Sequence, residues 1–328
     1  MTGSLLEIER LSVSFGGLRV LDDIDLKLAP GDRLGLVGES GSGKSTLGLA
    51  ILGLLVDTAS VSGTIRFAGA ALPIGDDRAM SAIRGGRIGF VYQDPMGGFS
   101  PIHTVGRHMH HAIAAAEPDI SRRAARERAA ALLAEVEIRD SAARLDDYPH
   151  QFSGGMLQRI MIASALAGNP QLLIADEPTT ALDATTQANV LRLLDRIASA
   201  RGMAVILITH DLGVVGRFCG DLAVLYCGNL VSLTTVARAM ANPVHPYTRG
   251  LLDARPRLDE KPARLRTIGG VLPRAGAAGG GCAFEPRCAL GRGVAICRNE
   301  RPLLLANRSG DRVACHLAGA ESEVAASC

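Results

Sequence analysis

A glycine-rich loop near the N-terminus has the residue types and spacing of a phosphate-binding site. Residues 38–46 read Gly-Glu-Ser-Gly-Ser-Gly-Lys-Ser-Thr. Glycines let backbone N–H groups close around phosphate oxygens, and the helix that we expect to follow points its positive end at the same anion. In such loops the lysine reaches the β and γ phosphates, and the next hydroxyl binds Mg²⁺. The predicted nucleotide contacts are Gly38, Ser40, Gly41, Gly43, Lys44, Ser45 and Thr46.

Two adjacent acids, Asp176 and Glu177, come directly after a short apolar run. Neighbouring carboxylates at the edge of a sheet repel each other, and a nearby Mg²⁺ removes that cost. We expect Asp176 to hold the metal ion together with Ser45. Glu177 is then placed to orient or deprotonate an attacking water molecule.

Two further polar residues, Gln93 and His210, also follow short apolar runs. Taken alone, each would more often be structural. Open α/β sheets place ligand contacts at the carboxyl ends of their strands, so we expect both side chains near the phosphate loop. We therefore assign both to catalysis with Lys44 and Glu177, and we count Gln93 among the magnesium ligands.

A second glycine motif, Ser153-Gly154-Gly155, precedes another predicted helix. It offers a second anion-binding helix N-terminus, about a hundred residues after the first. Two phosphate sites for one nucleotide would be redundant. The motif therefore indicates that the chain contacts a nucleotide held by a partner molecule.

Four of the seven cysteines lie close together near the C-terminus: Cys282, Cys288, Cys297 and Cys315. A glycine-rich stretch, residues 276–281, precedes them and suggests a small separate unit held together by something other than a core. Disulfides are disfavoured in a cytosolic chain, so metal binding is the better interpretation. Zinc and a four-thiolate iron–sulfur cluster both stay open, because the spacings match neither familiar pattern. His316 is an alternative ligand to one of the cysteines.

The elements that would position these residues follow from the hydrophobic pattern. Alternating residues over 5–28 predict an antiparallel hairpin. Apolar runs predict strands over 33–37, 87–92, 171–176 and 203–208. Helices are predicted over 47–56, 121–136 and 186–200, with Ser121 as an N-cap. This alternation indicates an α/β fold, and the length of 328 residues suits one large and one smaller domain.

Charge and hydropathy exclude other classes of protein. The formal net charge is only +2, whereas a dedicated nucleic-acid binder would show a strong basic excess. The longest apolar runs fall well short of the ~20 residues that a membrane helix needs. No secretory leader is visible at the N-terminus, so we expect a soluble, cytosolic chain that reaches a membrane only through partners.

Six of these motifs, in this order, resemble those of ABC transporter ATPases. They are the phosphate loop as Walker A, Gln93 as the Q-loop, residues 152–156 as the signature, Asp176-Glu177 as Walker B, Ala181-Leu182-Asp183 as the D-loop, and His210 as the switch histidine. The resemblance covers residues 5–235. It implies a RecA-like core sheet, an antiparallel β subdomain and a helical subdomain at about 95–158. By the same resemblance Phe15 stacks on adenine, although the residues alone leave core packing equally open.

A narrower resemblance, to the oligopeptide/dipeptide/nickel importer ATPases, rests on residues 38–43, 93–96, 152–156, 242–243 and 245–252. Met156 is similar to the D-type ATPase of these systems, whereas residues 97–101 and 232–234 depart from the subfamily pattern. We therefore divide the chain into a nucleotide-binding domain, 1–235, and a C-terminal extension, 236–328. The resemblance implies a [4Fe-4S] cluster on the four cysteines, with zinc as the alternative.

The function implied by the resemblance is ATP hydrolysis that powers the import of dipeptides, oligopeptides or nickel. The implied partners are an F-type second ATPase, two integral membrane permease subunits and an extracytoplasmic solute-binding protein, with the chain on the cytoplasmic face of the inner membrane. Two alternatives are a soluble ABC ATPase without a transporter and a redox- or iron-sensing regulatory ATPase. The first usually carries two cassettes or a long coiled coil, and neither is evident in the sequence.

Overall fold

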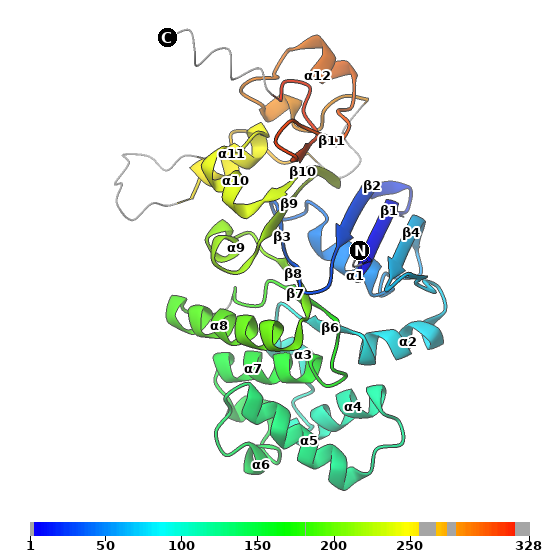
Figure 1. The fold of residues 1–328 in the computed structure, drawn as a ribbon, viewed down its shortest axis with the longest axis vertical. Coiled ribbons are helices and arrows are strands. Elements are labelled where there is room, and N and C mark those ends of the chain that lie inside the picture. The colour runs from blue at the N-terminus through cyan, green and yellow to red at the C-terminus, as the bar shows by residue number, and fades with distance from the viewer. Residues whose placement is uncertain (1–2, 181, 256–266, 274–279, 319–328) are drawn as a thin grey trace.

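The computed structural model describes residues 3–180, 182–255, 267–273 and 280–318. Ala181 of the predicted D-loop and residues 276–279 of the glycine-rich stretch lie outside the described residues. The molecule is elongated. Helices α4 to α7 form one end, and the C-terminal segment with α12 and β11 forms the other (Figure 1).

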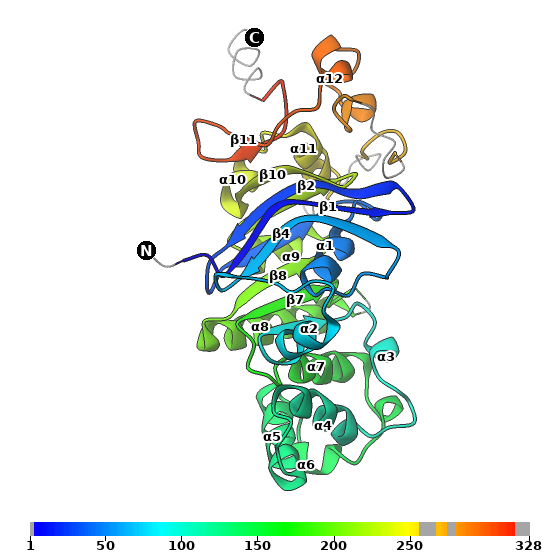
Figure 2. The ribbon, with the colours of Figure 1, turned by 90° about the vertical axis from the view of Figure 1, so that its right-hand side faces the viewer.

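The predicted N-terminal hairpin is confirmed. Strands β1 (Leu6–Phe15) and β2 (Leu18–Leu28) pair antiparallel, and β4 (Ala59–Phe67) and β5 (Ala70–Ala71) extend them into a sheet of order β2-β1-β4-β5. Alternate side chains of β1 and β2 are buried, as the period of two predicts. Figure 2 shows β1, β2 and β4 as one curved layer beside α1 (Lys44–Ile51).

The main sheet has the order β11-β12-β10-β9-β3-β8-β7-β6. Its strands are β3 (Arg33–Val37), β6 (Ile88–Val91), β7 (Leu172–Asp176), β8 (Ala204–Ile208), β9 (Asp221–Tyr226), β10 (Asn229–Thr235), β11 (Leu305–Ala306) and β12 (Arg312–Val313). Strands β3, β6, β7 and β8 are parallel and fully or largely buried. The four predicted strands are thus confirmed, and their carboxyl ends share one edge of the sheet.

Three further helices are α2 (Asp77–Gly86), α8 (Ala184–Arg201) and α9 (Leu212–Phe218). The prediction for α8 starts two residues late. Asp183 accepts hydrogen bonds from the backbone N–H groups of Thr185 and Thr186 and so begins the helix earlier. The prediction for α1 runs past its end, since Gly53 adopts a positive φ of 61°.

The helical subdomain comprises α3 (Pro95–Gly98), α4 (Val105–Ala116), α5 (Arg122–Glu135), α6 (Ser141–Arg144) and α7 (Gly154–Ala165). Ser121 caps α5 as predicted, because its hydroxyl accepts from the N–H of Ala124. A continuous buried cluster joins α4, α5 and α7 to α8. Among the described residues no helix has both the length and the apolar character needed to cross a lipid bilayer.

The C-terminal segment is not the separate unit that the glycine-rich stretch suggested. Strand β12 pairs antiparallel with β10 and so continues the main sheet. Phe284 and Cys288 pack in a buried cluster with Tyr226 and Tyr247. The segment also contains α10 (Val236–Ala241), α11 (Pro246–Asp253), the 3₁₀ turn η2 (Glu285–Arg287) and α12 (Ala295–Asn299). The edge of β10 that faces away from β9 pairs with β12, and local composition does not reveal this pairing.

Candidate active site

The phosphate loop lies between β3 and α1, as the sequence predicts. Lys44 is 6% exposed, and its ammonium donates to the carbonyl oxygens of Gly38 at 2.8 Å and Glu39 at 2.9 Å. Burial lowers the pKa of Lys44, and the charges of Glu177, Asp176 and Glu39 oppose this shift. A Cβ at position 38 would lie 2.2 Å from the carbonyl oxygen of Leu225, so only glycine fits there.

Asp176, at the end of β7, has the features of a cation ligand. Its side chain is buried, and its Oδ1 atom has no hydrogen-bond partner. Burial raises the pKa of Asp176, and a hydrogen bond with Ser45 opposes that shift. A buried carboxylate oxygen without a partner is costly unless a cation compensates it, so Asp176 and Ser45 fit a magnesium site.

The carboxylate of Glu177 is where the predicted catalytic residues meet. Oε2 accepts from the amide of Gln93 at 3.1 Å and from the hydroxyl of Thr180 at 2.8 Å. Oε1 lies 3.1 Å from Nδ1 of His210. Side chains that follow the carboxyl ends of β6, β7 and β8 thus converge on one group, as we expected because such strands end at one edge of the sheet.

The backbone and charge of Glu177 are also unusual. Its φ of 45° is a left-handed conformation that residues other than glycine rarely adopt outside functional sites. Burial pushes the pKa of Glu177 upward, but the hydrogen bonds from His210 and Thr180 and the charges of His210 and Lys44 outweigh it. The net effect is a lowered pKa, which keeps the carboxylate ionised at neutral pH.

Four predicted nucleotide contacts, namely Ser153, Gly154, Gly155 and Phe15, are not part of this cluster. The hydroxyl of Ser153 caps α7 by accepting from the N–H of Met156, and both Ser153 and Gly154 are exposed. Gly155 packs closely on α8, since a Cβ there would lie 2.6 Å from Cγ2 of Thr186. Phe15 ends β1 and packs half-buried against the core of the antiparallel sheet. Their roles toward a nucleotide stay predictions.

The four C-terminal cysteines line one small pocket, together with His245 and His316. A Cβ at Gly291 would lie 3.1 Å from Sγ of Cys297 and 3.4 Å from Sγ of Cys288, so both thiols face the same space. Burial raises the pKa of Cys315 to about 11. Within the described part of the chain, however, no group of three or more His, Cys, Asp or Glu residues is arranged to hold a metal ion.

Sequence reasoning missed two features of this site. The hydroxyl of Thr180 donates to the carboxylate of Glu177, a contact that was missed even though the two residues are only three positions apart. Arg287, in the C-terminal segment, forms an ion pair with Glu39 of the phosphate loop at 2.6 Å. The acidic residue Glu39 within the phosphate loop indicates that a positively charged side chain lies near it, but it does not identify that side chain as Arg287.

Comparison with family models gives two matches. Residues 21–180 match the family described as ABC transporter, and residues 233–297 match the oligopeptide/dipeptide transporter C-terminal region.

Two curated relatives are similar over nearly their whole length. A putative peptide import ATP-binding protein of Brucella abortus is 43% identical over 92% of both chains. The oligopeptide transport ATP-binding protein OppD of Salmonella typhimurium is 40% identical over 91% of this chain and 90% of its own.

Solved structures agree in fold. CbiO1 of Clostridium perfringens, part of an ABC transporter complex, has a TM-score of 0.64 at 26% identity over 73% of this chain and 91% of its own. The ABC transporter cassette MJ0796, solved as a dimer, has a TM-score of 0.62 at 28% identity over 70% of this chain and 98% of its own.

Proposed function

The chain belongs to the ABC transporter ATPase family, and on that premise we propose that it is the ATP-hydrolysing subunit that powers an importer of peptides. The observation that carries the proposal is the convergence of Gln93, Thr180 and His210 on the carboxylate of Glu177, beside the phosphate loop. The names of the relatives, peptide import and oligopeptide transport, indicate the class of solute.

Each residue of the site has a part in the hydrolysis that we propose. Lys44 binds the terminal phosphates of ATP after leaving the carbonyl oxygens that it now contacts. Ser45, Asp176 and Gln93 would hold Mg²⁺, which would neutralise charge on the phosphates. Glu177, held ionised by its neighbours, accepts a proton from the attacking water. His210 fixes the position of Glu177 and contacts the terminal phosphate.

We propose that each nucleotide site is completed by a second ATPase. The exposed N-terminus of α7, with Ser153, Gly154 and Gly155, would close over the ATP of the partner. The dimeric structure of MJ0796 supports this arrangement. Since Met156 resembles the D-type ATPase, we infer an F-type ATPase as the partner. Two permease subunits and a solute-binding protein complete the importer, and the chain docks on the cytoplasmic face of the membrane.

Affinity purification of the full chain from its native membranes tests this assignment. We expect two polytopic membrane proteins and a second ATPase to co-purify, and we expect proteoliposomes of the complex to take up labelled peptide only with ATP. The isolated chain should hydrolyse ATP weakly, because it lacks the partner. Recovery with ribosomes or DNA alone would favour the soluble ABC ATPase instead.

We further propose that the four-cysteine pocket holds a [4Fe-4S] cluster. The donor set supports it, because the four cysteine thiols line one pocket beside His245 and His316, and four thiolates are the ligands that such clusters use. A cluster is larger than a single ion, so its ligands lie farther apart than those of zinc.

Anaerobic purification with iron and sulfide analysis tests the cluster. We expect about four iron and four sulfide per chain, with visible charge-transfer absorbance, and a loss of most iron in Cys288→Ser. Cys219→Ser is the matched control, because Cys219 is also partly buried but lies outside the pocket. A colourless protein that carries zinc, or none of these metals, would contradict the proposal.

A further inference from the structure

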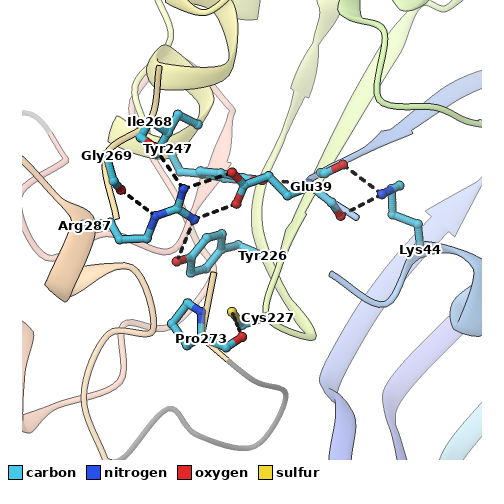
Figure 3. A network of polar contacts seen from close by, with 10 residues as sticks. Glu39, Lys44, Tyr226, Cys227, Tyr247, Ile268, Gly269, Pro273 and Arg287 are labelled. Carbon is cyan, nitrogen blue, oxygen red and sulfur yellow. Dashed lines mark hydrogen bonds and ion pairs between the residues drawn. The ribbon is translucent and has the colours of Figure 1, made fainter. Parts of the chain in front are cut away.

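An ion pair joins the phosphate loop to the C-terminal segment (Figure 3). Arg287, the last residue of η2, donates from Nη1 to Oε2 of Glu39 at 2.6 Å and from Nη2 to Oε1 at 3.0 Å. The Arg287 side chain is only 5% exposed, and that of Glu39 is 29% exposed. A two-pronged pair of this kind fixes orientation as well as charge.

The guanidinium of Arg287 is itself held from several sides. Nε donates to the carbonyl oxygen of Gly269 at 2.8 Å, Nη2 to that of Ile268 at 3.3 Å, and Nη1 to the hydroxyl of Tyr226 at 3.4 Å. Its centre also lies 5.8 Å from the ring centroid of Tyr226. Contacts other than Glu39 therefore preorganise the guanidinium, which lowers the entropic cost of forming the ion pair.

The backbone of Glu39 is held from the same side. Its N–H donates to the hydroxyl of Tyr247 at 2.9 Å, and Tyr247 is fully buried on α11. Its carbonyl oxygen accepts from Lys44. Leu272 lies 3.8 Å from the point that a Cβ on Gly41 would occupy. Residues from three parts of the C-terminal segment thus contact the loop that is to receive phosphates.

The charge of Glu39 explains why such support is needed. A free carboxylate in this loop would repel the phosphates of ATP and would compete with them for Lys44. Arg287 both neutralises Glu39 and directs it away from Lys44, as Figure 3 shows. We infer that Arg287 is a positioning residue for ATP binding, through which the C-terminal extension sets the affinity of the phosphate loop. This inference rests on the proposed function of the loop.

The test measures binding of a fluorescent ATP analogue to the full-length chain, in wild type, Arg287→Met, Glu39→Gln and the double variant. We expect Arg287→Met to weaken binding about tenfold, within the usual range of coupling between sites. The double variant should regain most of the loss, since the carboxylate that needs neutralising is gone. A purely structural role for Arg287 predicts no such rescue.

Two further variants keep the test decisive. Arg287→Lys retains the charge without the fork and should bind ATP between wild type and Arg287→Met, even if the methionine variant folds poorly. Arg301→Met is the control, because Arg301 joins the same segment to Asp22 of β2 and should leave affinity unchanged. Failure of wild type to bind would count against the proposed function. The inference would be overturned if Arg287→Met bound ATP with wild-type affinity. It would also be overturned if the double variant bound ATP as weakly as Arg287→Met.

Discussion

Glu177→Gln is expected to bind ATP normally and to lose at least a hundredfold in turnover, because general-base catalysis contributes about 10²–10⁴ in rate. Glutamine keeps the shape of the side chain and can still hydrogen-bond Gln93, Thr180 and His210. It cannot accept a proton from water. The lowered pKa of Glu177 shows that its neighbours favour the ionised form, which the substitution removes.

Phosphate release by the assembled importer measures this effect, and binding of a fluorescent ATP analogue measures affinity separately. Glu127→Gln is a matched control, since Glu127 is exposed on α5 and its ion pair with Arg123 lies on the helix surface. We expect that variant to match wild type in both assays. Near-normal turnover in Glu177→Gln would remove Glu177 from the role of base.

The edge of the sheet that carries the site could be predicted from the sequence. Buried parallel strands read as short apolar runs, so the polar residues Gln93, Asp176 and His210 marked where three of them end. The rule that open α/β sheets place ligand contacts at the carboxyl ends of their strands brought these residues together without any knowledge of distances. In the sheet β7 lies between β6 and β8. Gln93 and His210, which follow β6 and β8, therefore meet at Glu177, which follows β7.

Long-range contacts could not be predicted in the same way. Arg287 and Glu39 are 248 residues apart. The residues around Arg287, including the adjacent Cys288, form no local pattern from which its partner could be predicted. Strand β12 has only two residues, Arg312 and Val313, which is too short for a period to show. The glycine-rich stretch therefore suggested a separate unit, although the residues after it continue the main sheet and pack under the phosphate loop.

The surroundings of Lys44 explain why Lys44→Ala should be the most damaging substitution for ATP affinity. Lys44 is a buried cation beside the carboxylates of Asp176 and Glu177, and their charges favour its protonated form against burial. Its removal takes away the positive charge that meets the phosphates and leaves two acids facing them. We expect a loss of about a hundredfold or more in affinity, equivalent to at least ~2.7 kcal/mol.

Arginine should not restore binding at this position, since its planar fork is wider than an ammonium and the loop closes tightly around Lys44. Lys27→Ala is the control, because Lys27 is exposed on β2, where it pairs with Glu7. Titration with the fluorescent ATP analogue should separate the three variants clearly. ATP affinity within a few-fold of wild type in Lys44→Ala would mean that the phosphates bind elsewhere, and the loop would lose its place at the centre of the site.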